Sequence, residues 1–174
     1  YRMKYLLKFS ILLTCLSAVI NNYAQPIEAS ILKKQWTASW IAVPDEGANS
    51  YGVYLFRKNI ELSAKPSSFV IHVSADNRYK LFVNEKMVSL GPARGDLTHW
   101  NFETVDIAPY LQPGQNIIAA KVWNEAEWRP EAQITLRTGF ILQGGSVAEQ
   151  AVNTNDSWKC IRDSSYAPIK VTLP

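Results

Sequence analysis

Apolar and polar side chains alternate in short runs along most of the chain, and turn-forming residues separate the runs. The clearest case places Phe69, Ile71 and Val73 on one face of an extended segment and Val70 and His72 on the other. A period of two is typical of β-strands, and from Trp36 onward strand and turn signals dominate over helical ones. The pattern therefore predicts an all-β protein.

The predicted strands and their connections follow from this alternation. They cover residues 52–62, 69–74, 79–83, 86–90, 102–107, 117–123 and 133–142, with a last short strand around 158–161. A helical turn is predicted near 27–33. In the first strand, Val53, Leu55 and Ile60 are the inward candidates. The strand over 117–123 is almost continuously apolar, which predicts a central strand covered on both faces.

Turn chemistry supports the same architecture. Asn84 and Glu85 join two strands as a hairpin, and Asn tolerates the positive φ that such a turn requires. Pro113 and Gly114 form part of a corner between later strands. Short antiparallel strands with regular turns indicate a sandwich or barrel, and we expect a jelly-roll β-sandwich over residues 36–174.

The first 24 residues have a different character. Lys4 and Lys8 precede a short apolar run, which ends in polar residues and Ala24. This order is that of a secretory signal peptide, and the run is shorter than the ~20 residues that span a bilayer. We expect cleavage after Ala24, a linker over 25–35, and a secreted or periplasmic protein with no membrane contact thereafter. An uncleaved anchor, or a lipoprotein attached through Cys15, is the alternative.

Removing this segment changes the charge and the cysteine count. The chain carries 18 Lys and Arg against 15 Asp and Glu, and three of the basic residues but no acidic one lie in 1–24. The rest therefore has no net charge, which argues against a nucleic-acid partner. Only Cys160 would remain after cleavage, so no internal disulfide is expected.

Several motifs, in order, carry a resemblance to a known family. They are Trp36-x-Ala38-x-Trp40-Ile41, Phe56-Arg57-Lys58, Ala75-Asp76-x-Arg78-Tyr79-Lys80-Leu81-x-Val83-Asn84, Gly91-Pro92-Ala93-Arg94-Gly95, and the Asp106-Ile107-Ala108-Pro109-Tyr110-Leu111 corner with Gly114 and Asn116. This order resembles the N-terminal β-sandwich region of bacterial α-L-rhamnosidases. The hairpin and corner are also similar to the sugar-binding jelly rolls of β-galactosidase-like enzymes.

The resemblance implies an accessory domain of a large inverting glycoside hydrolase. The catalytic domain of that family is an (α/α)₆ barrel, which follows the sandwiches and supplies the acid and base carboxylates, and the sequence shows no such helical region. The expected partners are therefore that missing barrel and rhamnose-containing glycans. One departure from the family is Glu85, which stands where Gly is usual after the hairpin asparagine and would be strained at positive φ.

The acidic residues are expected to serve structure. Inverting hydrolysis needs two carboxylates roughly 6.5–9.5 Å apart. We expect Asp76 to pair with Arg78, Asp106 to cap a turn, and Glu125 and Glu127 to be solvated. Catalysis within this chain is thus the least favoured hypothesis.

A loop over residues 94–100 is the better functional candidate. Sugars bind to aromatic faces and to side chains that make paired hydrogen bonds with hydroxyls, and this loop and residues 123–129 supply both types. The candidate carbohydrate-binding residues are Arg94, Asp96, His99, Trp100, Trp123, Asn124 and Trp128. If both loops emerge at one end of the sandwich, they could form a shallow cleft. The alternative is that Trp100 and Trp123 are core or interface residues and that Arg94 pairs with Asp96.

No cofactor is predicted. His72 and His99 lie on different elements, and no cluster has zinc spacing. A structural Ca²⁺ is an open alternative without a calcium-loop pattern to support it. Three functions therefore stay open: an accessory domain of an α-L-rhamnosidase-like enzyme, an autonomous carbohydrate-binding module, and an intrinsic hydrolase.

Overall fold

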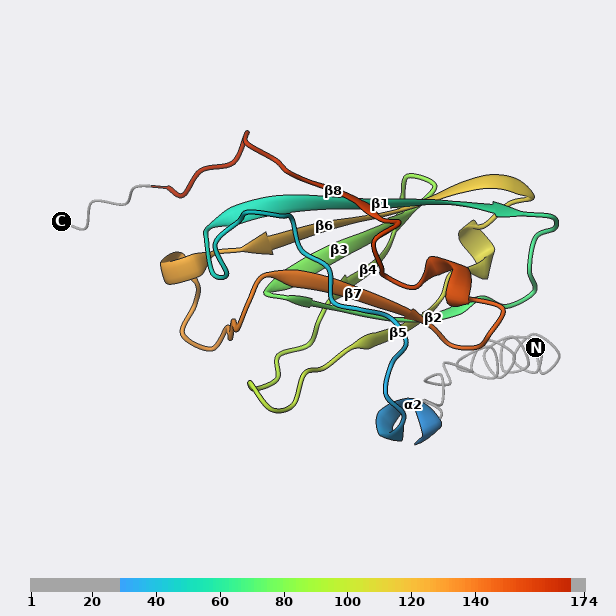
Figure 1. Cartoon of the computed structure of the whole chain (residues 1–174), viewed down its shortest axis with the longest axis horizontal. Helices are drawn as coiled ribbons and strands as arrows, with labels where there is room; N and C mark the ends of the chain where they lie inside the picture. The colour runs from blue at the N-terminus through green and yellow to red at the C-terminus, as the bar shows by residue number, and fades with distance from the viewer. Residues whose placement is uncertain (1–28, 170–174) are drawn as a thin grey trace, which may run out of the picture.

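Two antiparallel sheets pack face to face and form a β-sandwich (Figure 1). The computed structural model describes residues 29–169, so the predicted signal peptide over 1–24 and the first part of the linker lie outside the described residues. The larger sheet has the strand order β4-β3-β6-β1-β8, and the smaller has β5-β2-β7. The predicted all-β jelly-roll sandwich is confirmed.

The elements agree with most of the predicted ones. They are α2 (Ala29–Lys33), β1 (Gly52–Leu62), β2 (Val70–Asp76), β3 (Arg78–Val83), β4 (Lys86–Gly91), β5 (Glu103–Asp106), η1 (Ala108–Tyr110), β6 (Gly114–Asn124), η2 (Ala126–Trp128), β7 (Gly139–Gly144), η3 (Gln150–Val152) and β8 (Lys159–Arg162). Within residues 29–169, no helix has both the length and the apolar character needed to cross a membrane.

The turn between β3 and β4 has the predicted hairpin geometry. Asn84 and Glu85 both have positive φ, at 46° and 69°. Asn84 offsets the strain through its side chain, because its Nδ2 donates to the carbonyl of Tyr110 at 2.9 Å and its Oδ1 accepts from the amide of Ile117 at 2.9 Å. The hairpin is therefore attached to the corner and to β6.

One predicted strand was wrong in its first half. The alternating residues 133–138 are not a strand, and β7 begins only at Gly139. The backbone amides of Leu136 and Arg137 donate to the carboxylate of Asp76, and that of Thr138 donates to the carbonyl of Ala48. These tertiary hydrogen bonds replace a ladder with a neighbouring strand.

The strand β6 is central, as predicted, but it is covered on one face only. It pairs with β3 and with β1. Ile118 and Val122 are buried, whereas Ile117 on the opposite face is 43% exposed. The prediction of cover on both faces was wrong, because the smaller sheet packs against one side of the larger sheet alone.

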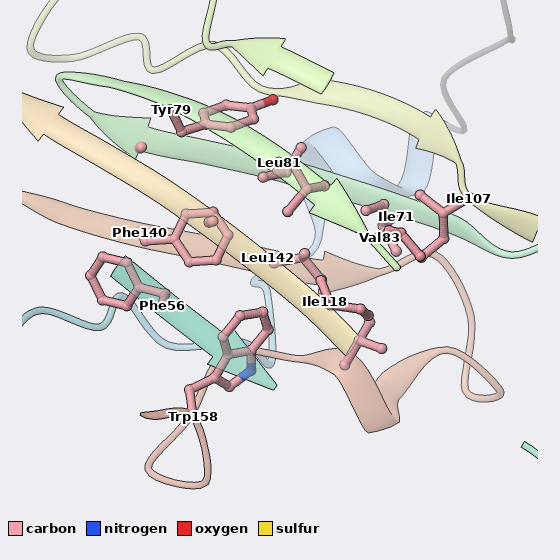
Figure 2. Close-up of a cluster of buried hydrophobic side chains, with 14 of the residues drawn as sticks. Phe56, Ile71, Tyr79, Leu81, Val83, Ile107, Ile118, Phe140, Leu142 and Trp158 are labelled. Carbon is pink, nitrogen blue, oxygen red and sulfur yellow. The ribbon is translucent and has the colours of Figure 1, made fainter. Parts of the chain in front are cut away.

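The core lies between the two sheets (Figure 2). Phe140 of β7 stacks on Phe56 of β1 with ring centroids 5.5 Å apart, and it meets the rings of Tyr79 and Trp158 edge-on. In β1 the inward side chains are Tyr54, Phe56 and Ile60. Of the predicted inward residues of that strand, Ile60 is confirmed, Val53 is buried but lies outside the cluster between the sheets, and Leu55 is only half-buried.

The chain reversal at the end of β5 depends on Asp106. Its Oδ1 accepts from the amides of Phe69 and Ala108, both at 2.9 Å, and its Oδ2 accepts from the hydroxyl of Ser68 at 3.1 Å. Burial alone would raise the pKa of the Asp106 carboxyl, but these hydrogen bonds outweigh burial and hold the pKa below its ordinary value. The predicted capping role is confirmed.

Replacement of the central aromatic tests the packing. We expect Phe140→Ala to lower the free energy of unfolding by about 3–5 kcal/mol, because a fully buried ring would leave a cavity between the sheets. Ile161→Ala is the control, since this side chain is 63% exposed and should change stability by about 0.5 kcal/mol or less. Urea unfolding measures both, and equal effects would contradict this account of the core.

Acid titration tests the corner. Because the folded-state pKa of Asp106 is lowered, its carboxylate stabilises the fold above the unfolded pKa of about 4 and loses that effect as the pH falls further. Asp106→Ala should lower the free energy of unfolding by about 1 kcal/mol at neutral pH. The gap between variant and parent should shrink on acidification, and a gap independent of pH would argue against the capping role.

Candidate functional site

Several loops emerge at the same end of the sandwich, which we call the loop end (Figure 1). The register places Gly52 opposite Asn124, Tyr79 opposite Gly91, and Asp76 opposite Gly139. The connection from β4 to β5 and the connection from β6 to β7 therefore both begin there. This is the arrangement that a shared cleft between the two predicted loops requires.

Two indoles meet at the loop end and form what we call the indole pair. Trp40 and Trp100 are edge-on, with ring centroids 5.9 Å apart and an interplanar angle of 66°. Trp40 is 47% exposed, and Trp100 is half-buried. A hollow of about 460 Å³ and another of about 610 Å³ both have these two residues in their walls. The pair therefore presents aromatic surface to two concave sites.

Backbone hydrogen bonds to β7 and to Thr154 hold the first indole. Ile41 and Phe140 exchange amide-to-carbonyl bonds of 2.9 Å in both directions. The amide of Ser39 donates to the carbonyl of Thr154, and the amide of Ala38 to Oε1 of Gln143, both at 2.9 Å. The segment 37–41 thus meets the outer edge of β7 at Phe140 and meets Thr154 at Ser39, so main-chain contacts on both sides set the position of Trp40.

The second indole is held by the loop between β4 and β5. Asp96 Oδ1 accepts from the amides of Thr98 and His99 at 2.8 and 2.9 Å, which makes a tight turn. Nδ2 of Asn101 donates to the carbonyl of Arg94 at 2.7 Å. The backbone carbonyl of Asn101 accepts from the hydroxyl of Ser74, also at 2.7 Å. These contacts fix the backbone on both sides of Trp100, and Asn101 joins it to β2 through Ser74.

In this loop Asp96 pairs with His99, and not with Arg94 as in the alternative drawn from the sequence. Asp96 and His99 are hydrogen-bonded, with 2.9 Å between Oδ2 and Nδ1, and the contact is an ion pair when the imidazole is protonated. Hydrogen bonds from the hydroxyl and the amide of Thr98, together with His99, hold the pKa of the Asp96 carboxyl well below its usual range. Within the described residues, no ion pair joins Arg94 to Asp96, so the alternative in which these two side chains pair was wrong.

Asp76 organises the other wall of the smaller hollow. The expected pairing with Arg78 was also wrong: the carboxylate accepts from the hydroxyl of Thr135 at 2.6 Å and from the amides of Leu136 and Arg137 at 2.5 and 2.7 Å. Its structural role is confirmed with different partners. These bonds bring Leu136 and Arg137 into the wall that faces Trp40 and Trp100.

The structure separates the predicted site residues into different places. His99 and Trp100 line the hollow of about 610 Å³, while Arg94 and Asp96 are exposed on the same loop. Trp123 and Asn124 line another hollow, on the outer face of the larger sheet. Trp128 lies on η2, 53% exposed. The last residues of the β6–β7 connection, including Leu136 and Arg137, line the hollow of about 460 Å³ together with Trp100. Trp128 of the same connection does not.

Asn124 makes only structural contacts in the described part of the chain. It is 1% exposed. Its Nδ2 donates to the hydroxyls of Thr135 and Thr138 at 2.9 Å, and its Oδ1 accepts from the amide of Ala126 at 2.8 Å. The side chain therefore joins the two ends of the β6–β7 connection.

Sequence reasoning missed Trp40, Leu136 and Arg137 as residues of the hollow. Trp40 was visible as the second tryptophan of Trp36-x-Ala38-x-Trp40, where a spacing of four places both rings on one face of an extended segment. Leu136 and Arg137 gave no usable signal, because their placement depends on the tertiary bonds to Asp76. As to metals, residues 29–169 contain no cluster of three or more His, Cys, Asp or Glu placed to hold an ion.

No protein-family model matches the sequence, and no curated protein sequence does. The chain is similar to a GH78 family rhamnosidase of Bacillus sp. GL1, with a TM-score of 0.66 and 27% identity over 74% of this chain and 14% of that one. The α-L-rhamnosidase of Streptomyces avermitilis gives a TM-score of 0.51 at 22% identity, over 76% and 12% of the two chains.

A lectin has the same architecture. The Pleurotus ostreatus lectin matches with a TM-score of 0.52 and 24% identity, over 74% of this chain and 35% of that one. This likeness and that to the Streptomyces enzyme show the fold alone. The resemblance to a β-sandwich of bacterial α-L-rhamnosidases is confirmed, and the matched region spans about a seventh of the Bacillus enzyme.

Removal of the Asp76 carboxylate tests how the smaller hollow is built. We expect Asp76→Ala to lower the free energy of unfolding by about 2–4 kcal/mol, because two backbone amides and one hydroxyl lose their acceptor in a buried position. Amide hydrogen exchange at Leu136 and Arg137 should accelerate. Asp156→Ala, an exposed carboxylate, is the control, and slow exchange retained in the Asp76 variant would contradict the assignment.

Proposed function

We propose that this chain is the accessory β-sandwich of a secreted α-L-rhamnosidase-like glycoside hydrolase and that it contacts glycan at the indole pair. The observation that carries the proposal is the joint presence of the rhamnosidase-type sandwich and two partly exposed indoles in concave surface at its loop end. Secretion rests on the basic and then apolar segment 1–24, and packing against an (α/α)₆ catalytic domain rests on the family resemblance.

The indole pair suits a sugar by its chemistry. The apolar C–H face of a pyranose packs against an aromatic ring, and charged or hydroxyl side chains at the rim satisfy its hydroxyls. Trp40 and Trp100 supply the rings. Arg137 in one hollow and His99 in the other supply side chains that can form hydrogen bonds with the hydroxyls of the sugar.

Three aspartates that precede or lie in the loops and turns of the sandwich are bound in ways that support a role other than hydrolysis. Asp76 and Asp106 are occupied by backbone amides, and Asp96 by its own loop. An inverting glycosidase needs an acid and a base on opposite sides of the scissile bond, and these carboxylates are each committed to a different turn or loop. We therefore assign the acid and base of the proposed enzyme to its catalytic domain.

The second candidate function is an autonomous carbohydrate-binding module. The likeness of the fold to a lectin and the exposure of Trp128 favour it. A module that works alone would bind saccharide as a separate chain, whereas an accessory domain depends on a neighbour. The two functions are distinguished by whether affinity for rhamnosides needs the catalytic domain.

A titration with L-rhamnose and with rhamnosides tests the site. We expect Trp40→Ala and Trp100→Ala each to weaken binding by about 5–30-fold, as the loss of one aromatic contact of about 1–2 kcal/mol implies. Trp128→Ala is the matched control and should leave affinity unchanged, because Trp128 is outside both hollows. Calorimetry with the chain alone and with the catalytic domain added gives the affinities.

Three results would count against the proposal. Loss of affinity in Trp128→Ala but not in Trp40→Ala would move the site to the tip of η2. Binding that is absent both with and without the catalytic domain would remove the glycan contact. Turnover of an aryl rhamnoside by the chain alone would show that the hydrolytic site lies within it.

A further inference from the structure

The outer face of the larger sheet carries a hollow of its own, near the loop end. It has a volume of about 330 Å³, and its walls include Tyr51, Trp123, Tyr166, Lys80, Lys121 and Glu125. We call it the sheet-face hollow. None of these residues lines the hollows beside the indole pair. It is therefore a separate concave surface with aromatic and basic walls.

Two of its lysines face each other in the sheet. The register places Lys80 of β3 directly opposite Lys121 of β6. Leu90 lies on the far side of Lys80, and Leu55 on the far side of Lys121. Side chains that are directly opposite in an antiparallel pair have Cβ atoms about 4.5–5.5 Å apart, and like charges there destabilise the sheet. The row thus holds two adjacent positive charges flanked by apolar residues.

These charges are only partly compensated within residues 29–169. Lys121 donates to the hydroxyl of Tyr166 at 3.2 Å and lies 5.2 Å from the centroid of that ring. Lys80 has no hydrogen-bond acceptor among the described residues. Arg78, which is directly opposite Trp123, adds a third cation to the same face of the sheet.

Two carboxylates lie nearby, and neither is bonded to these lysines. Glu125 lines the hollow. Asp163 is occupied by the hydroxyl and the amide of Ser165; these hydrogen bonds, with a smaller effect of Lys121, lower the pKa of its carboxyl. With three cations against two carboxylates, the face keeps a positive excess beside the indole of Trp123.

We propose that the sheet-face hollow binds a saccharide that carries a carboxylate, a uronic acid residue. The sugar ring packs against Trp123 and Tyr166, and its carboxylate lies between the ammonium groups of Lys80 and Lys121. A carboxylate placed there removes the repulsion between the two lysines and gains charge-assisted hydrogen bonds from both. Neutral sugars would gain the aromatic contact alone. This site does not depend on the glycan contact proposed at the indole pair.

The test compares trigalacturonic acid with its fully methyl-esterified form, which keeps the rings and removes the charges. We expect the acid to bind at low ionic strength and the ester to bind at least tenfold more weakly. The double variant Lys80→Gln/Lys121→Gln should weaken binding of the acid by a similar factor. Lys86→Gln, an exposed lysine at the other end of β4, should leave it unchanged, and so should Trp40→Ala.

Further variants keep the test decisive. Glu125→Gln should strengthen binding of the acid by a few fold, because it removes the carboxylate that lines the hollow. Each single lysine variant should give an intermediate loss if the double variant folds poorly. Equal binding of acid and ester, equal binding of a poly-glutamate peptide, or no binding of the acid at millimolar concentration would overturn the proposal. Loss of acid binding in Trp40→Ala would assign it to the indole pair instead.

Discussion

The contact between the two sheets through Phe140 is the interaction on which the rest of the structure depends. Its ring is fully buried and packs against Phe56, Tyr79 and Trp158, which come from different strands or connections of the larger sheet. The backbone of the same residue pairs with Ile41 and so places the neighbouring Trp40. One residue of β7 thus joins the hydrophobic core to the candidate site, and a site built in this way inherits the rigidity of the sandwich.

Buried polar side chains complete the loop end where strand pairing stops. Asp76 and Asn124 close the two ends of the β6–β7 connection, and Gln133 donates to the carbonyl of Asn77 at 3.1 Å. Each of these groups is buried and would be costly to leave without a partner. Because each of them has hydrogen-bond partners, the irregular β6–β7 connection has a defined shape. This explains how residues 133–138 are held outside both sheets despite their alternating sequence.

Local patterns sufficed for the parts of the fold that are decided locally. Alternation and turn chemistry predicted β1 with its observed bounds, the hairpin at Asn84 and the cap at Asp106. They failed where distant residues decide: residues 133–138 alternate as a strand would, but Asp76 takes the amides that a ladder would need. The apolar run of β6 could not reveal that one of its faces is open, because the number of packed layers is a property of the whole fold.

The same limit applies to the candidate site. Trp100 and His99 were predicted because an aromatic and polar loop is a local signal, whereas Trp40 joins them from a segment more than fifty residues earlier in the chain. Asn124 was predicted as a sugar contact from its type and its neighbours. Its burial and its bonds to two threonines depend on the tertiary fold, and its neighbours in the sequence do not reveal them.

The segment 37–41 lies before the first regular strand but is bonded to the sandwich. It pairs with the outer edge of β7 at Ile41 and occupies Gln143 through Thr37 and Ala38. An edge strand with free amides and carbonyls is a template for pairing with another chain, and proteins commonly cover such edges. A version of this sandwich that started after Ile41 would leave the amide and the carbonyl of Phe140 without partners at the outer edge of β7, while Asn153 and Thr154 would still cover Gly144 and Leu142. Residues 37–41 are therefore part of the folded unit, although they precede its first regular strand, β1.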